Sequence, residues 1–182
     1  MSPTIAAHTM ARLSVPALAL ALLAAPSYLP ATEHGQVREQ DQKQPLYLEA
    51  DSAELDEAKA LSVYTGNVFI KQGSMEVRGN QVTVHHDAEN KPKHIMAVGA
   101  PAKYRQQMEG DEKEVEAEAL RMEYDVAKDE ITLIDRAVLF QDKDTFRSDR
   151  IVYDRAKGQV KAGASAKGKE RVKIFIKNPA QR

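Results

Sequence analysis

The sequence predicts an all-β protein in which antiparallel hairpins stack on one another and fold into two facing layers, as in a jelly roll or a partly open clamp. Three observations lead to this prediction. From Pro45 onwards, apolar and polar side chains alternate in short runs that Gly, Asp, Asn and Lys interrupt, as is typical of strands joined by turns. The same pattern returns four times along the chain. No window keeps the three-and-four spacing of a long amphipathic helix.

Residues 1–31 have the composition of a secretory signal peptide. They contain no acidic residue and one basic residue, Arg12, which precedes an apolar run over 13–25 and small residues up to Ala31. The apolar run is shorter than the ~20 residues that a transmembrane helix needs, and prolines interrupt the segment. We expect cleavage after Ala31. A retained membrane anchor and a true start at Met10 are the alternatives.

The charge balance argues against nucleic-acid binding. The chain has 26 Lys and Arg against 27 Asp and Glu, and removal of residues 1–31 takes away one Arg and no acid, which leaves 25 against 27, a net charge of −2. A nucleic-acid-binding protein usually carries a concentrated basic excess. The chain has no Cys, which excludes disulfides and thiolate metal sites. Its remaining length suits a single domain with its own core.

Four hairpin repeats follow a polar lead-in. Residues 32–44 are aperiodic and are expected to form a flexible lead-in with at most a helical turn, residues 45–177 the β domain, and residues 178–182 a disordered tail. The repeats begin, at spacings of 29, 38 and 31 residues, at Asp51, Asn80, Glu118 and Asp149. Polar turns are expected at 56–59, 87–92, 125–129 and 154–158, and corners at Gly66, Gly99, Asp135 and Gly163. Repeats of ~30 residues that cannot bury an apolar face alone stack on their neighbours.

Each strand has two faces, and one of them is expected to point inward. In "YTGNVFIKQGSMEV" (64–77), Val68 and Ile70 point one way while Phe69 and Lys71 point the other. The apolar face is stable against an opposing layer. The residues expected to point inward are Leu46, Leu48, Leu55, Leu61, Val63, Val68, Ile70, Val77, Val82, Val84, Met96, Val98, Tyr104, Met122, Tyr124, Val126, Leu133, Leu139, Val172, Ile174 and Ile176.

No catalytic residue, metal site or cofactor is predicted. His85 and His86 are adjacent in a strand, so their side chains point to opposite faces and cannot chelate one ion together. The acidic run "EGDEKEVEAEA" (109–119) could supply a carboxylate pair for glycoside hydrolysis. It is better explained as a charged, solvated loop, because it is a like-charge run with no aromatic platform for a sugar.

The C-terminal run "KGKERVKIFIK" (167–177) has two explanations. Val172, Ile174 and Ile176 form one face, whereas Lys173 lies on the opposite face with Phe175. The run is either an edge strand that Lys protects against promiscuous pairing, or an edge that pairs with a partner strand or meets anionic headgroups. The aliphatic interior likewise has two explanations, a lipid groove or a dry core, since alternation alone also fits a dry core.

Four segments resemble a known family. "QPLYLEADSAELD" (44–56), "YTGNVFIKQGSMEV" (64–77), "GAPAKYRQ" (99–106) and "MEYDVAKDEITL" (122–133), in this order and spacing, are similar to the LptA-type, OstA-like (organic-solvent-tolerance) family of lipopolysaccharide-transport proteins. The resemblance runs from about residue 44 to residue 160.

This resemblance implies a V-shaped antiparallel β jelly roll of stacked hairpins in the periplasm, with an apolar groove for the acyl chains of lipid A. It implies head-to-tail self-association, an LptC-like inner-membrane partner at the N-terminal edge and an LptD-like outer-membrane partner at the C-terminal edge. The family's lipid-facing positions fall here on Leu46, Leu48, Tyr104, Tyr124 and Val126.

The expected function is that of a non-enzymatic lipopolysaccharide carrier. We assign the lipid groove to the inward residues other than Leu61, Val98 and the three at the C-terminus. The expected partner edges comprise Pro45 and Tyr47 at one end and Val172, Lys173, Ile174, Phe175 and Ile176 at the other. The alternatives are a membrane-tethered LptC-like component, a structural repeat protein with a dry core, and a hydrolase that uses the acidic run.

Overall fold

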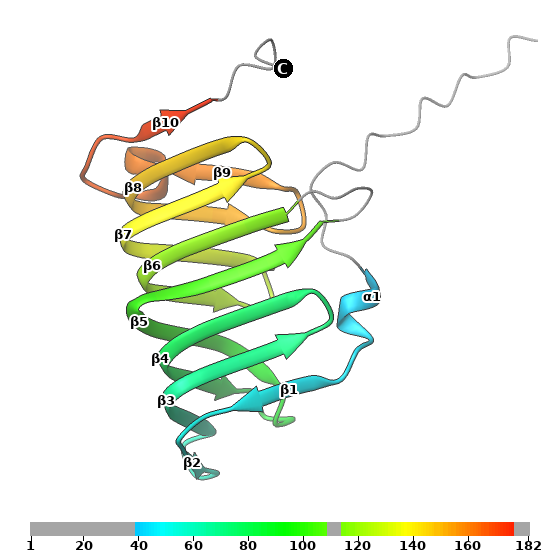
Figure 1. Cartoon of the computed structure of the whole chain (residues 1–182). Helices are drawn as coiled ribbons and strands as arrows, with labels where there is room; N and C mark the ends of the chain where they lie inside the picture. The colour runs from blue at the N-terminus through cyan, green and yellow to red at the C-terminus, as the bar shows by residue number, and fades with distance from the viewer. Residues whose placement is uncertain (1–38, 109–113, 177–182) are drawn as a thin grey trace, which may run out of the picture. The chain divides into compact units, whose positions relative to one another are not determined.

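The computed structural model describes residues 39–108 and 114–176, which form one antiparallel sheet with two short helical turns (Figure 1). The predicted signal peptide (1–31), the lead-in residues 32–38 and the predicted tail (178–182) lie outside the described residues. The elements are α1 (Glu39–Gln42), β1 (Leu46–Glu49), β2 (Ser52–Asp56), β3 (Leu61–Gln72), β4 (Met75–His86), β5 (Pro92–Gln107), β6 (Glu114–Asp125), β7 (Glu130–Gln141), β8 (Asp144–Asp154), β9 (Gln159–Ala162), a 3₁₀ turn (Gly163–Ala166) and β10 (Lys173–Phe175). The predicted all-β antiparallel class is confirmed.

The sheet is not closed. Its strand order is β1-β3-β4-β5-β6-β7-β8-β10, and β2 also pairs with β3 while β9 also pairs with β8. One end of the sheet is therefore made by β1 and β2, and the other by β9 and β10. Among the described residues, each of these four strands pairs on one side only.

Each long strand bends at a corner, and the bends divide the sheet into two layers. The pairing register shifts at the same level in successive hairpins, at 65/68, 78/81, 98/102, 118/121 and 134/137. We call the half that contains β1 and β10 layer A, and the half that contains β2 and β9 layer B. In Figure 1 the two halves run one in front of the other. Such bulges bend a strand and increase its twist.

The corner of β3 shows why its sequence turns there. Gly66 has a φ of +83° and Asn67 a φ of +45°, a region that Gly and Asn adopt more readily than other residues. A Cβ at Gly66 would lie 2.2 Å from an oxygen of Asp51. That carboxylate accepts a hydrogen bond of 3.0 Å from the Asn67 amide. The predicted corner at Gly66 is confirmed. The predicted corner residues Gly99 and Asp135 also lie within register shifts, those at 98/102 and 134/137.

Three hairpin turns of layer B use the same chemistry. The carboxylates of Asp56, Asp125 and Asp154 each accept the backbone N–H of a Lys three residues later, at 3.0, 3.2 and 3.0 Å. The same Lys side chain also pairs with the carboxylate, at 2.6, 2.6 and 2.7 Å. An Asp that bonds its own backbone favours a turn over continued pairing, so the recurring D-x-A-K ends each strand. The predicted turns lie where the sequence placed them.

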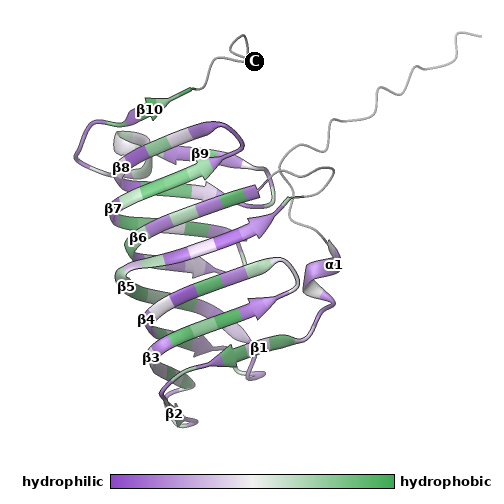
Figure 2. Cartoon of the chain, viewed as in Figure 1, coloured by the Kyte–Doolittle hydropathy of each residue, from purple (hydrophilic) through white to green (hydrophobic). Residues whose placement is uncertain are grey.

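The inner faces of the two layers are apolar. Directly paired residues of antiparallel strands share a face, so the register identifies each row. One row of layer B consists of Leu55, Ser62, Val84, Ile95, Tyr124, Ile131, Tyr153 and Val160. One row of layer A consists of Leu48, Ile70, Val77, Tyr104, Ala117, Leu139, Phe146 and Ile174. Figure 2 shows the resulting alternation of hydrophobic and hydrophilic residues along the strands.

Four predicted inward residues lie on the outer face. Ser62 is buried and pairs with Val84, which places its neighbours Leu61 and Val63 on the other side of the sheet. Met96 and Val98 likewise alternate with the buried Ala97. The prediction was wrong because it chose the more hydrophobic residue of each pair. The bulges also change the phase of alternation within β4, β5 and β6, which a continuous pattern cannot show.

The predicted acidic loop is partly a strand. Strand β6 begins at Glu114, and Val115, Ala117 and Ala119 point inward with at most 1% of their surface exposed. The intervening Glu side chains point outward. The small size of Ala hid the alternation in the sequence. Residues 109–113 lie outside the described part of the chain.

We expect Leu133→Ala to lower the free energy of unfolding by about 2–5 kcal/mol, because Leu133 has 0% of its surface exposed on the inner face. Met96→Ala, which removes a similar side chain from the outer face, should lower it by less than about 1 kcal/mol. Urea denaturation of both variants measures the difference. Equal losses would contradict the assignment of the two faces.

Candidate functional site

The space between the layers brings together most of the predicted groove residues. Buried inner-face positions include Val68, Ile70, Val82, Val84, Tyr104, Met122, Leu133 and Leu139, and Leu48, Val77 and Tyr124 pack against them while partly exposed. Val63 and Met96 do not contribute, because they lie on the outer face. Val126 is in the turn after β6 and has 37% of its surface exposed.

The inner face becomes exposed at both ends of the sheet. Leu46 and Leu55, on β1 and β2, have 60% and 68% of their surface exposed. Ile174 and Ile176, at the other end, have 55% and 70% exposed. The apolar strip therefore runs from the first strand pair to the last, and only its middle is covered.

The predicted partner segments are the terminal strands of layer A. β1 pairs only with β3, and β10 pairs only with β8, among the described residues. Tyr47 and Phe175 point to the outer face and have 51% and 66% of their surface exposed. Pro45 and Val172 directly flank the two strands. Within residues 39–108 and 114–176, the second edge of each strand is therefore unpaired.

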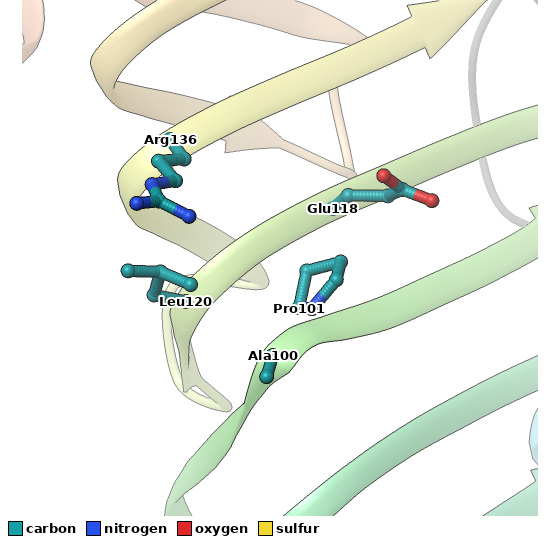
Figure 3. A pocket seen from close by; sticks show the side chains of 5 residues that line it. All are labelled: Ala100, Pro101, Glu118, Leu120 and Arg136. Carbon is teal, nitrogen blue, oxygen red and sulfur yellow. The ribbon is translucent and has the colours of Figure 1, made fainter.

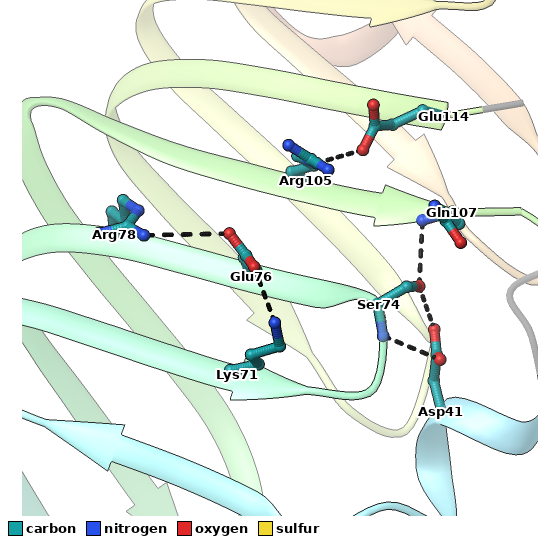
Figure 4. A network of polar contacts seen from close by, with 8 residues as sticks. All are labelled: Asp41, Lys71, Ser74, Glu76, Arg78, Arg105, Gln107 and Glu114. Atoms are coloured by element: carbon teal, nitrogen blue, oxygen red, sulfur yellow. Dashed lines mark hydrogen bonds and ion pairs between the residues drawn. The ribbon is translucent and has the colours of Figure 1, made fainter.

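A buried carboxylate anchors the lead-in to the rim of layer A (Figure 4). Asp41 of α1 has 7% of its surface exposed, and it accepts hydrogen bonds from the backbone N–H of Ser74 at 2.9 Å and from its hydroxyl. Gln106, which is also buried, donates to Asp41 at 3.0 Å and accepts from the hydroxyl of Tyr104. This chain of contacts links α1 to the buried inner-face residue Tyr104. The fit is close, since a Cβ at Gly73 would lie 2.3 Å from Asp41.

A buried cation lies at the rim of layer B. Arg155 follows β8 and has 5% of its surface exposed. Its guanidinium lies 3.5 Å from a carboxylate oxygen of Asp129, and its carbon lies 5.0 Å from the ring centre of Tyr124. Nε of Arg155 is buried and has no hydrogen-bond partner within the described part of the chain. A buried donor without a partner is destabilising by about 1–3 kcal/mol, which makes this arrangement unusual for a purely structural residue.

Three tyrosines interact electrostatically with this cation, and they come from both layers. Burial raises the pKa of Tyr104 well above its usual range, although the charge of Arg155 acts in the opposite direction. Burial likewise raises the pKa of Tyr124 and of Tyr153 to about 12. The hydroxyl of Tyr124 donates to Asp129 at 2.8 Å, and that of Tyr153 approaches the sulfur of Met108 at 3.8 Å. The tyrosines are therefore neutral hydrogen-bond donors at physiological pH.

The outer face is charged and offers no catalytic arrangement. Lys71 pairs with Glu76 at 3.2 Å, and Arg105 pairs with Glu114 across neighbouring strands (Figure 4). A cavity of about 210 Å³ lies at the corner of β5, β6 and β7 (Figure 3). It is lined by Ala100, Pro101, Glu118, Leu120 and Arg136. A single acid and a single Arg, without a nucleophile or a base, do not form a reaction centre.

The described residues contain no cluster of three metal-ligating side chains, and none of their helices is long and apolar enough to cross a membrane. His86 is half-buried and its Nε2 lies 2.9 Å from the hydroxyl of the inward-facing Ser62, whereas His85 points outward. The predicted separation of these two histidines onto opposite faces is confirmed.

Sequence reasoning missed Asp41, Gln106 and Arg155. Asp41 belongs to a polar segment without periodicity, so its burial has no signal in the sequence. Arg155 occupies the second position of the recurring D-x-A-K turn, where the earlier turns have Glu57 and Val126. The turn pattern therefore placed Arg155 at the rim, but only the structure shows that its side chain is buried.

We expect the stability of the protein to fall at alkaline pH because of Tyr104 and Tyr153. Their folded-state pKa values lie above the value of 10.0 for an unfolded chain, so the unfolded state loses its protons first as the pH rises. Stability should be unaffected below pH 10 and should fall above it by up to about 1.4 kcal/mol per pH unit for each buried tyrosine. Urea denaturation between pH 8 and about 11 measures the slope. A Tyr104→Phe variant with an unchanged slope would contradict this account.

Known proteins with the same fold and sequence pattern identify the family. The family described as "LptA/(LptD N-terminal domain) LPS transport protein" matches residues 47–159. The lipopolysaccharide export system protein LptH of Pseudomonas aeruginosa is 38% identical over 123 residues, which is 68% of this chain and 70% of LptH. The protein LptA of Escherichia coli K12 is 31% identical over 165 residues, which is 90% of this chain and 88% of LptA.

A crystal structure extends the likeness to three dimensions. It shows LptH, described as the LptA-homologous periplasmic component of the lipopolysaccharide transport device of Pseudomonas aeruginosa, and superposes on this chain with a TM-score of 0.69 at 34% identity. The superposition covers 76% of this chain and 99% of the LptH chain. The chain therefore belongs to the LptA and LptD N-terminal-domain family of lipopolysaccharide-transport proteins.

Proposed function

We propose that this chain is a periplasmic, non-enzymatic carrier that holds the acyl chains of lipopolysaccharide between layers A and B. The observation that carries the proposal is the continuous apolar inner face of a sheet that is not closed, exposed at one end at Leu55 and at the other at Ile174. Each methylene that is kept from water contributes about 0.8 kcal/mol, so a lipid with several acyl chains needs such a covered path to cross an aqueous space.

The lining suits a cargo that has to move. Its residues are mostly Val, Leu, Ile and Ala with a few Met and Tyr, so no single anchor dominates. A deep local well would trap the lipid, whereas many similar side chains bind it almost evenly along the strip. In the middle, Val82 and Leu133 have 0% of their surface exposed. Acyl chains can enter there only if the layers part, and the corners are the natural hinges because they are where the strands bend.

The covered middle of the interior also favours a second candidate, a structural repeat protein with a dry core. This candidate requires that the layers stay in contact and that no lipid enters. Neither the carrier nor the structural repeat protein requires a reactive side chain. Accessibility of the inner face to lipid separates the two.

Photo-crosslinking in cells tests the carrier. A photoreactive amino acid at Leu48 or Tyr104, both on the inner face, should give adducts with lipopolysaccharide. The same amino acid at Val63 or Met96, on the outer face, serves as the matched control and should give none. Adducts that form equally on both faces, or on neither, would refute the carrier and, in the second case, favour the dry core.

We further propose that copies of the chain associate head to tail, and that the β1 end meets an LptC-like partner and the β10 end an LptD-like partner. The supporting observation is that β1 and β10 each pair on one side only, and strand addition to an open edge is a common mode of assembly. The residues that precede Thr32 are proposed to be the export signal that leads to the periplasm.

Charged substitutions at the exposed edges test this assembly. Tyr47→Asp and Phe175→Asp change side chains that have 51% and 66% of their surface exposed, so the fold should be retained. Each variant should form fewer oligomers than the unchanged chain in light scattering at increasing concentration. Chemical crosslinking into ladders that survives in both variants would contradict association through these edges.

A further inference from the structure

Arg155 carries a positive charge at the edge of a mostly apolar interior. Its side chain is 6% exposed, and it lies at the rim of layer B, immediately after β8. The backbone holds it there, since the N–H of Arg155 donates to the carbonyl oxygen of Asp129 at 3.0 Å. The next hairpin turn of the same layer thus fixes the position of the guanidinium.

The guanidinium is incompletely neutralised. It has five N–H donors, and among the described residues its contact with an acid is a single ion pair of 3.5 Å with Asp129. The same oxygen of Asp129 already accepts the hydroxyl of Tyr124 at 2.8 Å, which is the shorter contact. Nε of Arg155 is buried and has no hydrogen-bond partner in that part of the chain. Donors are therefore available for an anionic group that the interior does not itself provide.

The surroundings combine this cation with groups that suit a lipid. Among the residues that the structure describes, the hydroxyl of Tyr153 approaches only the weak sulfur acceptor of Met108, at 3.8 Å, so it can donate to a stronger acceptor. Ile131, in the same inner-face row as Tyr153, and Leu133 and Leu139 in other inner-face rows are apolar and buried. A cation and a hydroxyl at the rim of an apolar interior match a molecule with an anionic head and hydrocarbon tails. Arg is well suited to bind phosphate, because its planar donors match two oxygens at once.

We propose that Arg155 binds a phosphate group on the head of the lipid whose acyl chains lie between the layers. This inference rests on the proposed carrier function and adds a phosphate-binding position at the rim of layer B. The phosphate would take the free donors of Arg155 and the hydroxyl of Tyr153. Asp129 would then act as a competing anion, which keeps the guanidinium in place when no lipid is bound.

Binding of three probes to the full chain tests the proposal: bisphosphorylated lipid A, the same lipid without its phosphates, and inorganic phosphate. The unchanged protein should bind the phosphorylated lipid at least tenfold more tightly than the dephosphorylated lipid. Arg155→Met should reduce this preference to less than about threefold. Its affinity for the dephosphorylated lipid should stay the same. Inorganic phosphate should compete only at far higher concentration, because it has no tails. If inorganic phosphate alone bound strongly, the site would not be specific for a phosphate carried by a lipid, and the proposal would be overturned.

Two further variants keep the result interpretable. Arg147→Met removes an exposed Arg on the outer face of β8 and should leave the phosphate preference unchanged. Asp129→Asn removes the competing anion at a position with a φ of +50°, which Asn tolerates, and should increase the preference. If Arg155→Met does not fold, a lack of increase in Asp129→Asn overturns the proposal.

The outcomes separate this proposal from the carrier function. If the unchanged protein binds neither lipid, the carrier function fails. If it binds both lipids equally, or if Arg155→Met weakens both by the same factor, the carrier function stands and the phosphate site is refuted. In the last case Arg155 only supports the structure.

Discussion

The structure depends on backbone pairing in a sheet that bends without closing. Every long strand from β3 to β8 is paired on both sides, and the hairpins stack through these ladders. Because each strand bends at its corner, one sheet provides both apolar faces of the interior. The one-sided pairing of β1 and β10 among the described residues follows from the same feature, since a closed barrel would have no strand paired on one side only.

The rim is where the polar residues of the interior gather. Asp41 and Gln106 lie at the rim of layer A, and Arg155 and Asp129 at that of layer B. Tyr104 connects the two groups, because it donates to Gln106 and its pKa responds to the charge of Arg155. A lipid that enters through the rim would have to disturb contacts of this kind. In the proposed carrier, the apolar middle would set how strongly tails are held, and the polar rim would distinguish the head group.

The sequence predicted the architecture better than the details of the interior. Alternation, turn residues and the repeat were enough to predict the antiparallel class, the corner at Gly66 and the turns of layer B, because these depend on local chemistry. Met96 was placed on the wrong face because alternation changes phase at the bulge of β5, and a bulge depends on pairing between strands. Val63 was placed there because it is more hydrophobic than its neighbour Ser62, which is the residue that points inward. The alternation over 115–119 was missed because Ala carries little hydrophobic signal. The buried Asp41 and Arg155 depend on contacts far apart in the sequence, 33 residues in the case of Asp41 and Ser74.

The central claim is that the two layers part to admit acyl chains, and a distance measurement tests it most directly. The chain has no Cys, so Lys143→Cys and Lys157→Cys would give two unique positions for spin labels, one at the β7–β8 turn of layer A and one at the β8–β9 turn of layer B. Pulsed electron spin resonance would report the distance between them with and without lipid A. We expect the distribution to shift to longer distances when lipid A binds. Bound lipid A with an unchanged distance would contradict the account.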